Sequence, residues 1–174
     1  MILGLSLASF TLLHVSISIV GIAAGIVVLL GMLRSDRLPA WTALFLLATV
    51  LTSVTGFMFP NSTFTPALAF GVISVIVLAI ALIALYGFGL AGGWRAAYVV
   101  TALLALYLNA FVLVAQGFQK VAFLNAFAPT QADPPFAIAQ SVLLIAFLWF
   151  GWRALTRFHP EIALGQHPPG TQQA

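Results

Sequence analysis

The chain has 174 residues, of which 63% are hydrophobic and 5% are charged. A soluble domain averages about 25% charged residues, so water cannot be the main solvent of this chain. The net charge of +3 comes with six Lys and Arg scattered over the whole length. Because they form no basic stripe, nucleic acid is not an expected partner. The absence of cysteine excludes disulfides, thiolate catalysis and iron–sulfur clusters within the chain.

Long apolar runs dominate the sequence. A bilayer core about 30 Å thick needs about 20 apolar residues per helix. Runs of this length lie at about 7–33, 41–59, 67–90, 95–118 and 136–158. Pro39 closes the charged turn after the first run, and Pro60 stops the second. We therefore expect an all-α integral membrane bundle of five transmembrane helices, a single domain over 1–158, followed by a flexible cytoplasmic tail at 159–174.

The basic residues predict how this bundle is oriented. If the N-terminus is outside, only Lys120 lies in an outer segment. The inner segments then hold Arg34, Arg37, Arg95, Arg153 and Arg157. The tryptophans map to the same side, at Trp41, Trp94, Trp149 and Trp152. Positive charge favours the cytoplasmic side and indole rings favour the interface, so we expect the N-terminus outside and the C-terminus inside. Arg outnumbers Lys five to one and the chain is rich in Ala, Leu and Gly, which is typical of a GC-rich bacterial genome, so we expect a bacterial inner membrane protein.

The first run carries an unusual stripe. At helical spacing its members fall on one face of the helix, and they are Thr11, His14, Ser18, Gly21 and Gly25. The other faces are Ile, Val and Leu, so we expect the stripe to face protein. Gly21 and Gly25 form a GxxxG motif, which lets helix backbones approach closely. We expect it to pack within the bundle rather than to form a dimer.

On this topology, four helices bring polar groups into the outer half of the bilayer. Buried polar groups are costly there unless they are paired, so an ionisable residue inside the membrane suggests a site. The candidate ligand-binding residues are His14, Ser18, Thr52, Asn109, Gln116, Lys120 and Gln140. Asn109, Gln116 and Lys120 share one face of the fourth helix. The alternative is that these side chains only hold helices together, at about 0.6–2 kcal/mol per contact.

Two further segments carry predictions. The stretch 118–127 either lies along the outer surface as an interfacial helix or projects as the end of the fourth span. Asn61-Ser62-Thr63 matches the N-glycosylation sequon, but the loop is very short and we expect no glycan there.

No catalytic signature is present, and we favour a protein that is not an enzyme. No nucleotide-binding or HExxH motif occurs. No intramembrane carboxylate could orient His14 toward the neighbouring serines, so a hydrolytic triad fails. Only His14 lies within a span, so bis-histidine haem ligation within one chain is excluded, although a homodimer could pair two copies. A quinone needs only a histidine or amide and an apolar slot.

The leading hypothesis is a small polytopic membrane protein whose outer-side polar pocket binds a hydrophobic small molecule or a lipid. The first alternative is an accessory or structural subunit of a larger membrane complex, or a homo-oligomer, with the polar groups acting between helices. The second is a redox component linked to quinone or haem. No cofactor is expected under the leading hypothesis, and the lipid bilayer is the constant partner.

Overall fold

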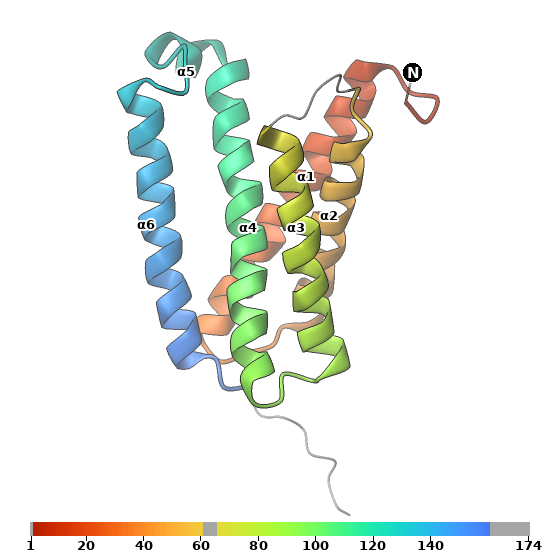
Figure 1. Ribbon diagram of the computed structural model, residues 1–174, viewed down its shortest axis with the longest axis vertical. Coiled ribbons are helices and arrows are strands. Elements are labelled where there is room, and N and C mark those ends of the chain that lie inside the picture. Colours follow the sequence, from red (N-terminus) through yellow and green to blue (C-terminus); the bar gives the residue numbers. More distant parts are fainter. Residues whose placement is uncertain (1, 61–65, 161–174) are drawn as a thin grey trace, which may run out of the picture.

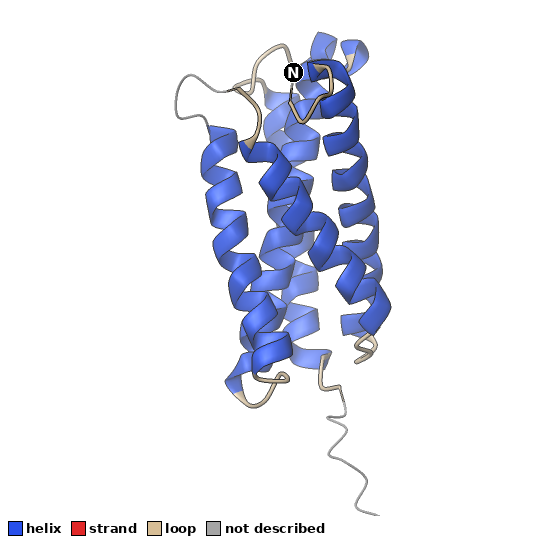
Figure 2. Cartoon of the chain, turned by 90° about the vertical axis from the view of Figure 1, so that its right-hand side faces the viewer, coloured by secondary structure: helices blue, strands red, loops and turns tan. Residues whose placement is uncertain are grey.

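The computed structural model describes residues 2–60 and 66–160 and is all-helical over these residues (Figure 2). The helices are α1 (Leu7–Leu33), α2 (Pro39–Phe57), α3 (Pro66–Leu82) with the π-helical turn η1 (Ile83–Gly87), α4 (Gly93–Lys120), α5 (Ala122–Phe127) and α6 (Pro134–Arg157). Within the described ranges, five helices are long and apolar enough to cross a membrane: Leu7–Leu33, Pro39–Phe57, Leu68–Gly87, Gly93–Lys120 and Pro134–Arg157. They indicate a membrane protein. The sequon at 61–63 and the tail from residue 161 lie outside the described residues.

Local sequence sets where the helices begin. Ser6 caps α1, because its hydroxyl accepts a hydrogen bond from the Ser9 backbone N–H at 3.1 Å. Pro39 opens α2 and Pro134 opens α6, at positions where the missing N–H costs nothing. The serine cap and the two prolines act within the local sequence and need no tertiary contact. The predicted helix starts therefore lie close to the observed ones.

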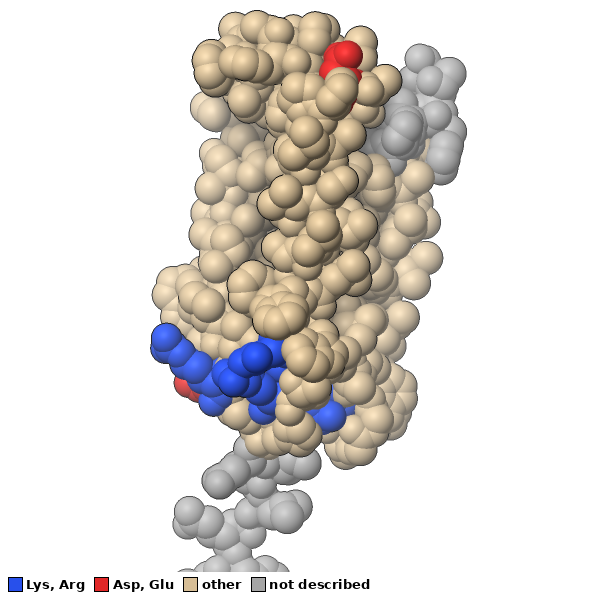
Figure 3. All heavy atoms as spheres, turned by 90° about the vertical axis from the view of Figure 1, so that its left-hand side faces the viewer, with Lys and Arg blue, Asp and Glu red and all other residues tan. Residues whose placement is uncertain are grey.

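The bundle has two different ends (Figure 1). The α5 end holds the start of α1, the end of α2, α5 and the start of α6. The arginine end holds the α1–α2 turn, the α3–α4 loop, the first turn of α4 and the end of α6, and five arginines belong to these segments. Figure 3 shows basic side chains gathered at this end, on the face over α6, and they are arginines because Lys120 lies at the end of α4. α1 is tilted, and it runs from beside α2 at the α5 end to beside α6 at the arginine end (Figure 1).

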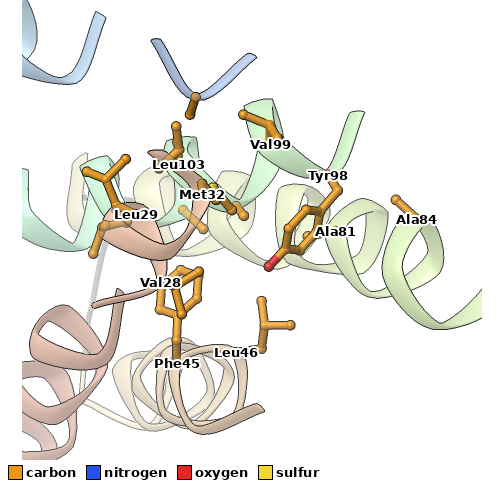
Figure 4. Close-up of a cluster of buried hydrophobic side chains, with 14 of the residues drawn as sticks. Val28, Leu29, Met32, Phe45, Leu46, Ala81, Ala84, Tyr98, Val99 and Leu103 are labelled. Carbon is orange, nitrogen blue, oxygen red and sulfur yellow. The ribbon is translucent and has the colours of Figure 1, made fainter. Parts of the chain in front are cut away.

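The apolar core lies in the half of the bundle nearer the arginine end. Figure 4 shows Val28 and Met32 of α1, Phe45 of α2 and Tyr98 of α4 converging there, and all four are buried. The buried polar side chains of Ser18, Ser53, Asn109 and Gln140 instead lie in the other half. Apolar packing therefore dominates the half nearer the arginine end, where Arg95 also donates hydrogen bonds to the Leu155 and Phe158 carbonyls.

The GxxxG motif packs inside the bundle, as predicted. A Cβ on Gly21 would lie 3.4 Å from the side chains of Ala48 and Thr49 on α2. A Cβ on Gly25 would lie 2.5 Å from Leu106 Cδ1 on α4. Ser18, Gly21 and Gly25 are buried, so the stripe faces protein along most of its length. The prediction is wrong at Thr11, which is exposed and donates to the Leu7 carbonyl of its own helix at 2.8 Å.

The stretch 118–127 does not continue the fourth span. α4 ends at Lys120, Val121 is extended (φ −89°, ψ 113°), and α5 is a separate helix. α5 lies between the ends of α4 and α6 (Figure 1), with Phe123 and Phe127 exposed. Of the two alternatives, this arrangement fits a helix that lies along the surface rather than a projecting span.

Candidate functional site

Ser18 and Asn109 join α1 to α4 in the interior of the bundle. The Ser18 hydroxyl donates to Asn109 Oδ1 at 2.7 Å, and both side chains are buried. The amide nitrogen of Asn109, Nδ2, is also buried and has no hydrogen-bond partner among the described residues. Most buried polar atoms in proteins are paired, so this donor requires an explanation.

Among the described residues, Gln140 on α6 has a buried amide acceptor without a partner, whereas Asn109 has a buried amide donor without one. Its Nε2 donates to the Phe111 carbonyl on α4 at 3.1 Å. Its Oε1 is buried and has no partner among the described residues. Phe111 lies two residues beyond Asn109, about 3 Å further along the α4 axis. The unpaired amide donor of α4, Asn109 Nδ2, and the unpaired amide acceptor of α6, Gln140 Oε1, therefore lie at similar depth.

His14 pairs with Thr55, and the geometry assigns its tautomer. Thr55 Oγ1 lies 2.7 Å from His14 Nδ1 and 2.7 Å from the Leu51 carbonyl oxygen. A carbonyl oxygen can only accept, so the single hydroxyl proton goes to Leu51. Nδ1 must then carry the proton that it donates to Thr55. In the neutral ring, which we expect because no intramembrane acid is near, Nε2 keeps a free lone pair.

Aromatic rings flank this histidine. The Phe59 ring lies edge-to-face with His14, with centroids 5.2 Å apart and planes at 85°. Phe10 packs against the same Phe59 ring at 5.1 Å. Gly56 is also close to the imidazole, because an added Cβ there would be 3.6 Å from His14 Cε1. Ring packing and the Thr55 hydrogen bond together hold the orientation of the imidazole.

Thr52, a predicted site residue, does not contact His14. Its hydroxyl donates to the Ala48 carbonyl of its own helix at 2.9 Å. The histidine partner is Thr55, one turn further along α2, which sequence reasoning missed. The hydroxyl-rich sequence at the end of α2 indicates a polar face. It does not indicate which turn of α2 contacts α1. That choice depends on the tilt of α1.

Gln116 and Lys120 share a face of α4 with Asn109, as predicted, but both are exposed. α4 has 28 residues and reaches the α5 end, where no neighbouring helix covers this face. Of the seven predicted residues, the structure pairs Ser18 with Asn109 and places His14 and Gln140 in contacts of their own. Thr52, Gln116 and Lys120 are not drawn into these contacts.

Two cavities lie at the ends of the bundle, and neither is lined by the seven predicted residues. One, of about 290 Å³, is formed at the α5 end by Phe118, Gln119, Ala128, Pro129, Thr130, Gln131 and Phe136. The other, of about 260 Å³, is at the arginine end. Within residues 2–60 and 66–160, no group of three or more His, Cys, Asp or Glu is placed to hold a metal ion.

Comparison with known protein families, with curated proteins and with solved structures finds no match for this chain.

Proposed function

We propose that this chain is an integral membrane protein of the bacterial inner membrane, with its N-terminus outside. We further propose that its buried polar groups toward the α5 end bind a small amphiphilic molecule or a lipid. The observation that carries the proposal is the pair of buried, unpartnered amide atoms, Asn109 Nδ2 and Gln140 Oε1.

The chemistry of these atoms defines the ligand that would satisfy them. Leaving a buried polar atom unpaired costs about 1–3 kcal/mol, so a ligand that pairs with both gains that free energy on binding. Asn109 Nδ2 needs an acceptor and Gln140 Oε1 needs a donor, and one hydroxyl group offers both. His14 Nε2 is a further acceptor on the same half of the bundle. An apolar molecule with hydroxyl groups, such as a quinol or a glycerolipid headgroup, has this chemistry.

The neighbouring hydroxyls do not need such a ligand. Thr49, Thr52 and Ser53 each donate to a carbonyl four residues earlier in α2. These groups are satisfied within their own helix and are consistent with a purely structural role. The case for binding therefore depends on the two amides and on the histidine, not on the number of polar side chains.

The exposed apolar face of α6 favours a second candidate function. α6 is the least covered span, and large apolar residues recur on it at alternating steps of four and three. Those exposed residues are Ile138, Val142, Ile145, Trp149 and Trp152. This spacing is typical of helix–helix seams, although lipid also covers such a face. It favours an accessory subunit of a larger membrane complex as the alternative.

Purification in a mild detergent, followed by organic extraction and mass spectrometry, tests the binding proposal. We expect a hydroxylated amphiphile to co-purify with the wild type and to be lost from Asn109→Leu and from Gln140→Leu. Gln116→Leu is the matched control, because it removes an exposed amide from the same helix as Asn109 and should leave the bound molecule in place. If all three variants retain every bound small molecule, the binding proposal is wrong. Stoichiometric co-purification of other chains would then favour the second candidate.

The orientation makes a separate prediction. The positive-inside rule predicts that the arginine end lies inside, because five arginines lie at this end and Lys120 lies at the other. A reporter enzyme that is active only outside the cytoplasm should be inactive when fused after residue 174 and active when fused before residue 1. Activity of the C-terminal fusion would contradict the proposed orientation.

A further inference from the structure

The cavity at the arginine end is formed by segments that are distant in sequence. It measures about 260 Å³ and is lined by Arg37, Gly89, Leu90, Gly92, Arg95, His159 and Pro160. These residues come from the α1–α2 turn, the α3–α4 loop, the first turn of α4 and the segment that follows α6. A tertiary arrangement, not a local charge run, brings the two arginines to one cavity.

The lining is cationic. Arg37 and Arg95 keep their charge at any physiological pH, and no carboxylate lines the cavity among the described residues. Asp36 is close in sequence, but its Oδ1 accepts from the Leu38 backbone N–H at 3.2 Å and is held in the α1–α2 turn. Arg95 Nη1 donates to the Leu155 and Phe158 carbonyls, and the N–H groups on Nε and Nη2 have no partner among the described residues.

Glycine forms one wall of the cavity. Gly89 and Gly92 have positive φ values of 56° and 53°, and a Cβ on either would meet nothing within 4 Å. Backbone is therefore accessible to a ligand on this side, directly before the N-terminus of α4 at Gly93. The His159 backbone N–H donates to Ser35 Oγ at 2.8 Å, which links the segment after α6 to the α1–α2 turn. Hydrogen bonds therefore connect the segments that contribute the cationic groups of the cavity.

We propose that this cavity binds a phosphate group, and in the membrane that of an anionic lipid headgroup. Arginine matches the geometry of phosphate oxygens, and the free N–H groups at a helix N-terminus add favourable charge. Basic pockets between membrane helices on the cytoplasmic side are suited to anionic headgroups. The volume is just below the range of about 300–1,000 Å³ for drug-sized ligands, which suits a headgroup. This site is independent of the one proposed toward the α5 end.

The arginines at this end also act as topology signals, which by itself does not require that any of them binds a ligand. Arg34, Arg153 and Arg157 lie at the same end but do not line the cavity. A topology signal treats all five arginines alike, whereas a phosphate site depends on those that line the cavity. Variants of lining and non-lining arginines therefore separate the two roles.

The experiment uses the full chain in a neutral detergent, with lipid binding followed by native mass spectrometry. The probes are phosphatidylglycerol and phosphatidylcholine, and the variants are Arg37→Gln and the matched control Arg157→Gln. Arg37 is chosen because Arg95 also caps α6 and its loss would disturb the fold.

We expect phosphatidylglycerol to bind more tightly than phosphatidylcholine. We expect Arg37→Gln to weaken its binding about fivefold, the effect of one cation at an anionic surface. Arg37→Lys should retain most of the affinity, and Arg157→Gln should change little.

Competition with inorganic phosphate distinguishes a lipid headgroup from free phosphate as the ligand of the cavity. If phosphate competes only weakly with phosphatidylglycerol, the site takes a lipid headgroup. If it binds the wild type as tightly as the lipid and loses affinity in Arg37→Gln, the site takes free phosphate, and the phosphate chemistry still holds. Equal binding of the two lipids, or equal losses in Arg37→Gln and Arg157→Gln, would overturn the proposal.

Discussion

Replacing Gly25 with leucine should lower the free energy of unfolding by about 3 kcal/mol, the upper part of the range for overpacking a well-packed interior. A Cβ at this position would lie 2.5 Å from Leu106 Cδ1 and 2.9 Å from Phe45 Cδ2 and Cε2. Neither α2 nor α4 can move away without opening the apolar core, because Phe45 and Leu106 are themselves almost fully buried there. Denaturant or thermal unfolding of the purified protein in detergent measures the loss.

Gly21→Ala is the matched control within the same motif. A Cβ on Gly21 would lie 3.4 Å from Ala48 Cβ and from Thr49 Oγ1, which is close to ordinary van der Waals contact. We expect this variant to change the free energy of unfolding by less than about 1 kcal/mol. If both variants unfold like the wild type, α1 does not pack against α2 and α4 as described.

Replacing Arg95 with glutamine should destabilise the attachment of α6. The Arg95 guanidinium donates to the Leu155 carbonyl at 2.9 Å and to the Phe158 carbonyl at 2.8 Å, two groups at the α6 C-terminus. Hydrogen bonds from charged groups contribute about 1.5–3 kcal/mol each when buried. Because Arg95 is only half-buried, we expect a total loss of about 2 kcal/mol in the free energy of unfolding.

The same unfolding measurement checks this prediction. Arg157→Gln is its control, because it removes an exposed cation from the last turn of α6 that has no such contact in the described part of the chain. An Arg95→Gln variant as stable as Arg157→Gln would show that the two carbonyls do not depend on the guanidinium.

Much of the fold could be predicted because hydrophobic length and proline act locally. The first span is bounded by Ser6 and by the turn before Pro39, and its predicted extent coincides with α1. The end of the third span was harder to place. The run is apolar to about residue 90, but the helix passes into the π-helical turn and ends at Gly87. Gly89, Leu90 and Gly92 then reverse the chain with positive φ, which no hydrophobic pattern encodes.

The sequence predicts which residue types form the candidate site, but it does not predict which side chains pair by hydrogen bonds. Depth along each helix indicated that His14, Asn109 and Gln140 lie in the same half of the bundle. Which hydroxyl meets His14, and whether Gln116 is covered, depend on helix tilt and on where neighbouring helices end. These are properties of the assembled bundle, so periodicity in one helix cannot specify them.

The central claim is that the unpaired amides of Asn109 and Gln140 serve a ligand, and ligand add-back tests it most directly. A molecule that binds only the folded state raises stability in proportion to the logarithm of its concentration. Wild-type protein stripped of bound molecules should therefore unfold at a higher temperature when its own organic extract is returned, while Asn109→Leu and Gln140→Leu should not respond. Equal unfolding temperatures with and without the extract, or equal increases in the wild type and both variants, would contradict the claim.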